Sequence, residues 1–217
     1  MKRLIIKQFT VSLTILLNCC MVYFPQAVDI PLIEEKDDFR LATGMSIAGV
    51  HGTVSYGLTD MIAVQAFGNI NILTGFHIQG AVGLYKWFDE SFTGMELYGG
   101  YGYGGSLFDM QADRKIGNYH LPFIQFNIGR EVGVANTSID LGMGLKGGYL
   151  FGNFTGSDLN IHKRNGFIIE PTFLFRFETR RGAMYSIKFN YALPVNFNRK
   201  DIMFHSFNFS VGRHFWL

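Results

Sequence analysis

The sequence predicts an all-β fold, an antiparallel up-and-down transmembrane β-barrel of about ten strands, with about eight strands as the alternative. The first observation behind this prediction is that hydrophobic and polar residues alternate with a period of two along most of the chain. The second is composition: 22 Phe, 10 Tyr and 26 Gly among 217 residues, with 17% charged residues, are typical neither of a helical bundle nor of a disordered chain. Beyond the N-terminus no run of roughly 18 apolar residues occurs, so a membrane crossing must use strands.

The first 19 residues have the pattern of a secretory signal peptide. Lys2, Arg3 and Lys7 form a positive N-terminal region, and an apolar stretch from Phe9 to Leu17 follows it. This stretch is too short to span a bilayer and has the length of a signal sequence. Removing residues 1–18 takes three positive charges from a formal net charge of +2, which leaves −1. No basic patch remains, and no nucleic-acid partner is expected.

The only two cysteines, Cys19 and Cys20, stand directly after this apolar stretch. Each has a leucine three residues before it, which resembles the lipobox read by the bacterial lipoprotein signal peptidase. The resemblance implies that one of the two cysteines is lipidated and begins the mature chain. Cleavage of an ordinary signal peptide near Ala27 is the alternative.

Residues 20–38 are predicted to form a periplasmic tether, and residues 39–217 the barrel. Pro25 and Pro31 interrupt regular structure, and residues 34–38 form a solvated charged run. The alternating segments predict strands at residues 39–48, 51–58, 61–70, 75–86, 93–104, 119–130, 136–150, 166–178, 182–193 and 204–216. A tilted strand needs roughly 9–11 residues to cross the hydrocarbon layer, which these lengths supply.

Each alternating segment predicts one face toward lipid and one toward the lumen. From residue 185 to 193 aromatic and aliphatic residues hold the odd positions, while polar or small residues, Lys188 among them, hold the even ones. A period of two places these sets on opposite faces of a strand. The same division recurs at residues 166–178, 139–149, 94–104 and 76–85. Apolar residues outside and polar residues inside are what a membrane barrel requires.

The connections between the predicted strands support an even strand number. Turns after every second strand are short, whereas those at 105–118, 151–165 and 194–203 are long and polar. This asymmetry is typical of outer-membrane barrels, whose short turns face the periplasm. The parity depends on a hairpin at residues 48–50, because one continuous strand over 45–58 would break it.

The last segment places Phe207, Phe209, Val211 and Phe215 on one face. A C-terminal strand of alternating hydrophobic residues resembles the signal by which barrel-assembly machinery recognises its clients, so this machinery is an expected partner during biogenesis. Arg213 interrupts the lipid-facing row near the expected membrane interface, where a long side chain can reach the headgroups.

The N-terminal third also resembles a known family. A lipobox-like cysteine, the motif Tyr23-Phe24-Pro25, the run from Asp29 to Lys36, a first hairpin, and the run from Ser55 to Val64 followed by Asn69 are similar to the small outer-membrane β-barrel lipoproteins of the Bacteroidota. The resemblance covers residues 19–70. It implies the outer membrane of a Gram-negative bacterium. It also implies a periplasmic N-terminus anchored in the inner leaflet, because the acidic run starts only at Glu34 and not directly after the cysteine.

Motifs for catalysis or cofactor binding are weak. Residues 142–147 match GxGxxG, but they lie inside an alternating segment that no helix follows. His205 and Ser206 invite comparison with outer-membrane lipid hydrolases, yet adjacent strand residues point to opposite faces. The histidines show no metal-ligand spacing. We therefore expect no catalytic residue, cofactor or metal, and a lipid-modifying enzyme is the second alternative.

Charged residues on the predicted lumen face occur in equal numbers of each sign. They are Arg40, Glu96, Asp140, Lys146, Glu170, Arg176, Glu178 and Lys188. Ionised groups in a narrow barrel must be paired or hydrated. The balance favours an ion-pair network that plugs the lumen. In this network Lys146, Arg176 and Lys188 neutralise Glu96, Asp140 and Glu170. A selective pore would more often carry one sign in excess.

The sequence thus predicts a non-enzymatic outer-membrane barrel with a structural or accessory role in the cell envelope. Its expected partners are outer-membrane lipid and, through the loops at 105–118 and 151–165, other envelope proteins. A narrow channel for water or small solutes is the alternative function.

Overall fold

Most of the chain forms strands of a single sheet. The computed structural model describes residues 23, 26, 28–46, 48–71, 75–105, 116–134, 137–155, 161–179, 182–196 and 207–216. The strands are β1 (Phe39–Ser46), β2 (Gly49–Gly57), β3 (Ile62–Asn71), β4 (Gly75–Phe88), β5 (Thr93–Gly105), β6 (Ile116–Val134), β7 (Thr137–Thr155), β8 (Ile161–Glu178), β9 (Met184–Tyr191), β10 (Leu193–Val195) and β11 (Phe207–Trp216). A 3-10 turn, η1 (Asp89–Ser91), connects β4 to β5.

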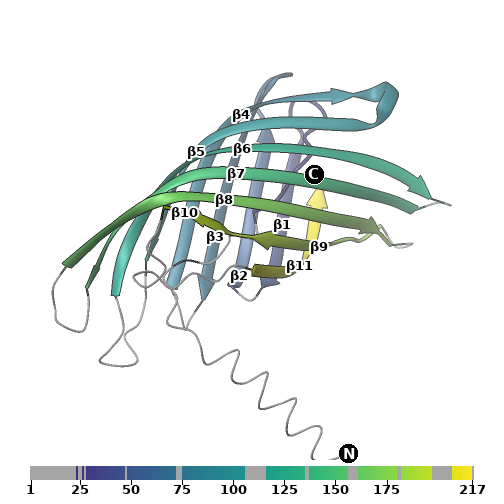
Figure 1. Ribbon diagram of the computed structural model, residues 1–217. Helices are drawn as coiled ribbons and strands as arrows, with labels where there is room; N and C mark the ends of the chain where they lie inside the picture. Colours follow the sequence, from purple (N-terminus) through teal and green to yellow (C-terminus); the bar gives the residue numbers. More distant parts are fainter. Residues whose placement is uncertain are drawn as a thin grey trace, which may run out of the picture.

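The sheet closes on itself (Figure 1). Each strand from β1 to β8 pairs with the next, β8 pairs with β9, β9 with β11, and β11 with β1, all antiparallel. Strands β9 and β10 keep one register on β8, where Asn190 faces Thr172 and Leu193 faces Ile169. Counted as one strand, they complete a closed antiparallel barrel of 10 strands. The predicted fold class is therefore confirmed, and the smaller alternative is wrong.

The connections define two ends of the barrel. The turn end carries the short connections after β2, β4, β6 and β8, together with the start of β1 and the end of β11. The loop end carries the connections after β1, β3, β5, β7 and β10. The first hairpin belongs to the loop end, where Ser46 faces Gly49. The parity on which the strand number depended therefore holds.

Strands β6, β7 and β8 are longer than the sequence predicts. At the loop end they extend three to five residues into the predicted loops 105–118 and 151–165. Backbone pairing continues there, for example between Asn153 and Lys163, although the outward side chains have become polar. Alternation marks the hydrophobic part of a strand, whereas the hydrogen-bonded ladder continues beyond it. The wall is therefore longer along β6–β8 than along β1 and β2 (Figure 1).

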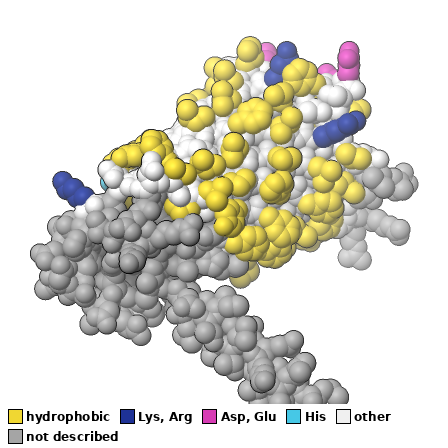
Figure 2. All heavy atoms as spheres, viewed as in Figure 1, with side chains coloured by type: hydrophobic (Ala, Val, Ile, Leu, Met, Phe, Trp, Pro, Cys, Tyr) yellow, Lys and Arg dark blue, Asp and Glu magenta, His cyan; other side chains and the backbone are white. Residues whose placement is uncertain are grey.

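The two faces of the wall differ as the alternation predicts. Outward hydrophobic side chains are exposed, for example Ile124 at 64% and Met143 at 54%, whereas the inward Lys188 is 1% exposed. Figure 2 shows the hydrophobic side chains spread over the visible outer face, with Lys and Arg side chains at the margins. The outer surface is thus a hydrophobic band and the inner surface is polar.

Rows of aromatic rings border this band. Toward the loop end a continuous row crosses β4 to β8, with 5.0 to 6.2 Å between consecutive ring centroids: Phe76, Tyr103, His120, Phe151, Tyr149 and Phe167. Toward the turn end Phe177 lies 5.8 Å from Phe175 and 6.1 Å from Tyr185. Beyond the loop-end row, Asn153, Lys163 and Asn165 are exposed and polar, so the hydrophobic band ends there.

The segment before β1 lies inside the barrel. Val28, Ile30, Leu32 and Ile33 are 0 to 3% exposed. We call the described residues of 23–33 the lumen segment. The expectation that residues 20–38 form a tether outside the barrel is therefore wrong for this part, because its apolar side chains pack against the inner wall. The charged residues directly after it, Glu34 to Asp37, are exposed.

Candidate functional site

The lumen segment runs along the inside of the barrel. Tyr23 packs in the loop half, against residues of β6, β7, β8 and the β9–β10 junction: Tyr119, Leu121, Leu150, Ile168 and Ala192. Ile33 packs at the turn end, against residues of β3, β4 and β5: Ala63, Tyr85 and Tyr98. The segment therefore passes through the lumen from the loop half to the turn end before the chain turns into β1.

Asp29 of the lumen segment is surrounded by basic side chains of the wall. Its Oδ1 lies 3.3 Å from Nζ of Lys188 on β9 and 3.9 Å from Nη2 of Arg176 on β8. Its Oδ2 lies 3.4 Å from Nδ1 of His214 on β11. Asp29, Arg176 and Lys188 are at most 2% exposed. A carboxylate so buried requires partners of opposite charge, so this contact fixes the segment to three wall strands.

Arg176 also joins the lumen segment to β7. Its Nη1 donates to Oδ2 of Asp140 at 3.0 Å, and its Nη2 donates to the backbone oxygen of Ile30 at 2.6 Å. Arginine suits this position because its planar fork donates in several directions at once. One buried guanidinium thus holds a wall carboxylate and the backbone of the segment together.

A second buried ion pair lies toward the loop half. Lys146 on β7 pairs with Glu170 on β8, and the Tyr23 hydroxyl donates to Glu170 Oε1 at 2.8 Å. Nζ of Lys146 also lies 5.6 Å from the centre of the Phe123 ring. Tyr23 therefore completes the hydrogen bonding of a wall ion pair.

The backbone of the segment is bonded to the wall at two further points. The Ile33 amide donates to Glu96 Oε1 at 2.9 Å, while Asn127 Nδ2 donates to Glu96 Oε2 at the same distance. Gln65 Nε2 donates to the backbone oxygen of Asp29 at 3.3 Å. These bonds satisfy polar groups of the segment that have no strand neighbour, as burial requires.

Glycines of the wall make room for the segment. A Cβ on Gly129 would lie 2.6 Å from Leu32, and one on Gly144 would lie 3.3 Å from Ile30. By contrast, a Cβ on the outward Gly147 would meet nothing within 4 Å. The inward glycines of β6 and β7 therefore leave space into which the side chains of the segment extend.

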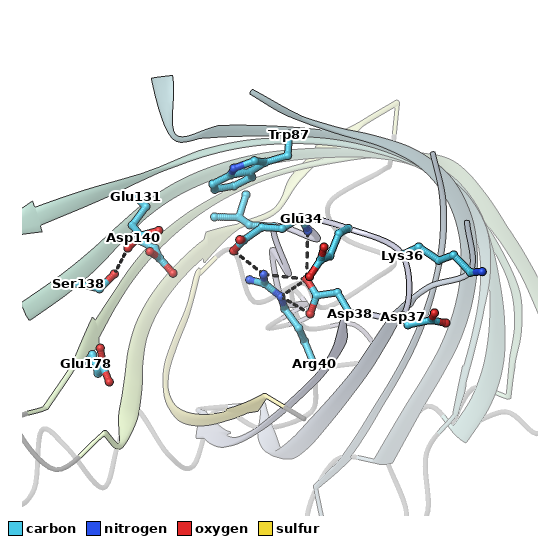
Figure 3. A pocket seen from close by; sticks show the side chains of 12 residues that line it. Glu34, Lys36, Asp37, Asp38, Arg40, Trp87, Glu131, Ser138, Asp140 and Glu178 are labelled. Atoms are coloured by element: carbon cyan, nitrogen blue, oxygen red, sulfur yellow. Dashed lines mark hydrogen bonds and ion pairs between the residues drawn. The ribbon is translucent and has the colours of Figure 1, made fainter. Parts of the chain in front are cut away.

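Arg40 holds the residues between the lumen segment and β1. Its Nη2 lies 2.8 Å from both Glu34 Oε1 and Asp38 Oδ2, and its Nη1 donates to the Pro31 oxygen at 2.7 Å. Figure 3 shows these side chains converging on Arg40. The chain thus makes its turn into β1 around one guanidinium.

An acidic cavity opens beside this turn. Its volume is about 530 Å³, and it is lined by Leu32, Glu34, Glu35, Lys36, Asp37, Asp38, Arg40, Trp87, Glu131, Ser138, Asp140 and Glu178. Figure 3 shows carboxylates on both sides of it. The turn-end mouth of the lumen is therefore open to solvent and negatively charged.

Only some of the predicted lumen charges pair with one another within the wall. The structure brings Lys146 together with Glu170, and Arg176 together with Asp140. Lys188 instead faces Asp29, which the sequence analysis placed in a tether.

The remaining three predicted residues also have other neighbours. Arg40 pairs with Glu34 and Asp38, Glu96 accepts hydrogen bonds from an amide and a carboxamide, and Glu178 lines the turn-end cavity. The predicted wall charges thus have partners in the lumen segment and in the turn into β1 as well as in the wall.

Sequence reasoning missed Tyr23 and Asp29 as lumen residues. A signal for both was present, because Val28, Ile30, Leu32 and Ile33 make the segment too apolar for a tether in water. A single acid within such a run needs a buried partner. Alternation along β11 places His214 on the face opposite Phe215, but nothing near it in the sequence indicates Asp29.

Other candidate sites add no chemistry to the lumen. Cys19, Cys20, His205 and Ser206 lie outside the described residues. The GxGxxG match at 142–147 lies within β7. In the part of the chain that the structure describes, no cluster of His, Cys, Asp or Glu is arranged to hold a metal ion.

Two further observations concern the chain as a whole. No helix among the described residues is long and apolar enough to cross a membrane. No protein-family model and no curated protein matches this sequence.

Proposed function

We propose that the protein is a non-enzymatic outer-membrane β-barrel that closes its own lumen with its N-terminal segment and serves a structural or accessory role in the cell envelope. The observation that carries the proposal is the contact of buried Asp29 with Lys188 and Arg176, which ties that segment to the wall. Acidic and basic side chains pair in the interior, so the lumen has no excess of one sign that could select an ion.

The outer surface supports a membrane location. Its hydrophobic band is bordered by aromatic rows at both ends, the arrangement by which membrane barrels meet the two interfaces. A soluble protein rarely exposes hydrophobic area on this scale. The long-loop, short-turn asymmetry favours an outer membrane with the turn end in the periplasm.

The lumen segment also bears on the leader. Tyr23 is fully buried, packs against Tyr119 and donates to Glu170. A mature chain that began near residue 28 would lack this side chain, and Glu170 would lose a donor. These contacts favour cleavage before residue 23 over cleavage near Ala27, as a mature chain that begins at a lipidated Cys19 or Cys20 requires.

A narrow water path is the second candidate function. Among the described residues, Thr53 Oγ1, Gln65 Oε1, Asn69 Nδ2 and Gln79 Nε2 are buried polar atoms without a hydrogen-bond partner. All four belong to neighbouring strands, β2, β3 and β4, on the lumen face. Such atoms also occur on β5, β6, β8, β9 and β11, and buried polar atoms of this kind are usually satisfied by water, which favours hydration of the lumen.

Planar-bilayer recording of the purified full-length protein separates these functions. A closed lumen gives no single-channel steps, whereas stable steps in the wild type would favour the channel. Fractionation of native membranes tests the location, since the proposal requires recovery with the outer membrane. Mass spectrometry of the N-terminal peptide tests the anchor, because a mature terminus beyond Cys20 would exclude lipidation.

The enzyme alternative has its own test. Replacing His205 and Ser206 by Ala leaves the outer-membrane lipid composition unchanged if the barrel is not a lipid-modifying enzyme. An altered composition would support the enzyme.

A further inference from the structure

The outward-facing charged side chains that the structure describes on the strands share one sign. Among the strand side chains that the structure describes, those that are charged and face outward are Lys86, Arg130, Lys163 and Arg213. The carboxylates of the strands lie on the other face, in the lumen or at the turn-end cavity: Glu96, Glu131, Asp140, Glu170 and Glu178. The outer face of the described strands therefore offers cations to its surroundings, while the acids of these strands lie on the inner face.

Three of these cations lie near the turn end. Lys86 stands two residues before the end of β4, Arg130 four before the end of β6, and Arg213 three before the end of β11. Lys163 lies at the other end, beyond the aromatic row of the loop end. The three turn-end cations thus lie on three different strands, β4, β6 and β11, near one margin of the hydrophobic band.

Two of these cations lie beside aromatic rings of the band. Nζ of Lys86 is 5.1 Å from the centre of the Phe88 ring, and Cζ of Arg213 is 4.8 Å from that of Phe215. Both rings are exposed on the outer face. A basic side chain at such a border covers apolar surface with its stem and keeps its charged group at the edge of the apolar region. This position suits a ligand that has an anionic group directly above a hydrocarbon layer.

We propose that Lys86, Arg130 and Arg213 bind the phosphate groups of anionic phospholipids in the leaflet at the turn end. The inference rests on the proposed membrane location and adds the class of lipid to it. Arginine and lysine form charge-assisted hydrogen bonds with phosphate oxygens. Three separated cations around a band match the planar array of headgroups in a leaflet, whereas a soluble anion would require cations that converge on one point.

The same arrangement accounts for Arg213, which the sequence analysis found as an interruption of a lipid-facing row. At its register position it faces Tyr185, near the turn-end start of β9, and Thr43, in the middle of β1. Arg213 stands three residues before the turn-end terminus of β11, beside the exposed ring of Phe215, so the interruption of the row places a cation in the turn-end part of the band.

The test is native mass spectrometry of the folded full-length protein in an equimolar mixture of phosphatidylglycerol and phosphatidylcholine. Each basic residue near a membrane contributes about fivefold to affinity for anionic lipid. The wild type is expected to retain phosphatidylglycerol preferentially. Lys86→Gln, Arg130→Gln and Arg213→Gln are each expected to reduce that preference about fivefold, and the triple variant to abolish it.

Lys163→Gln is the matched control, because it removes one outward cation at the other end and is expected to leave the preference unchanged. The single variants keep the test decisive if the triple variant does not fold. Equal retention of both lipids by the wild type, or an undiminished preference in all three turn-end variants, would overturn the proposal. So would an equal loss in Lys163→Gln, since net charge alone would then explain the effect.

Two further arms separate the sources of the signal. Excess inorganic phosphate is expected to leave the preference intact, and competition by it would point to a soluble-anion site. Reconstitution into vesicles distinguishes this inference from the proposed function. Failure to insert into any vesicle contradicts the membrane location, whereas insertion without lipid preference contradicts only the binding of anionic headgroups.

Discussion

Replacing Asp29 by Asn is the most direct test of the filled lumen. The substitution keeps the size of the side chain and one acceptor oxygen but removes the charge that faces Lys188, Arg176 and His214. Breaking one side of a buried ion pair costs about 3–5 kcal/mol. Arg176 retains Asp140 at 3.0 Å, so the loss falls mainly on Lys188. We therefore expect about 3 kcal/mol, the lower part of that range.

Urea titration followed by the gel shift of folded barrel measures this loss. The midpoint should fall while the slope stays constant, because the surface exposed on unfolding is unchanged. Glu35→Gln is the control, since Glu35 is exposed, belongs to the same N-terminal region, and should change stability by less than about 0.5 kcal/mol.

A double variant makes the argument specific to the pair. Asp29→Asn combined with Lys188→Met removes both charges and should be less destabilised than the sum of the single changes, because the two side chains are in contact. Additive effects, or an Asp29→Asn variant as stable as Glu35→Gln, would refute the reasoning. The carboxylate would then be hydrated, and the segment would not occupy the lumen.

Three further predictions use the same unfolding assay. Tyr23→Phe should lose about 1.5–3 kcal/mol, since it removes a buried hydrogen bond to the Glu170 carboxylate and keeps the ring; an unchanged midpoint would mean that Tyr23 does not reach the carboxylate. Phe175→Arg should lose about 2–4 kcal/mol in a bilayer by placing a charge on the lipid face, and a neutral result in vesicles would argue against a membrane there. Gly44→Ala should lose about 1–3 kcal/mol, because its Cβ would lie 2.5 Å from a backbone oxygen of β11, whereas Gly68→Ala has open space and should be neutral; equal effects would contradict the close approach of β1 and β11.

The wall of the barrel was predictable because its signal is local. In β9 every second residue faces outward, and a period of two is enough to assign Lys188 and Asn190 to the inside. The same reasoning found the first hairpin and the ten strands. It predicted β6–β8 too short. Near Asn153 the outward side chains are polar, so hydrophobic and polar residues no longer alternate, although the backbones still pair.

The contents of the lumen were less predictable because their contacts are distant in sequence. Asp29 and Lys188 are 159 residues apart, and Tyr23 and Glu170 are 147 apart. Alternation tells which face a residue lies on but not what lies opposite it. Equal numbers of inward charges were therefore interpreted as pairing within the wall, when Lys188 has its acid in the N-terminal segment.

The position of the lumen segment inside a closed ring restricts the order in which the molecule can be assembled. A length of chain enters a ring either by being enclosed while the ring is open or by being pulled through the finished hole. The second route would draw everything ahead of Tyr23 past side chains that already fill the interior. Enclosure requires only that β11 pair with β1 after the segment has been laid along β7 and β8. Pairing of β1 with β11 is therefore the step that closes the barrel around the segment. A bulky domain fused to the N-terminus is compatible with enclosure but not with pulling through.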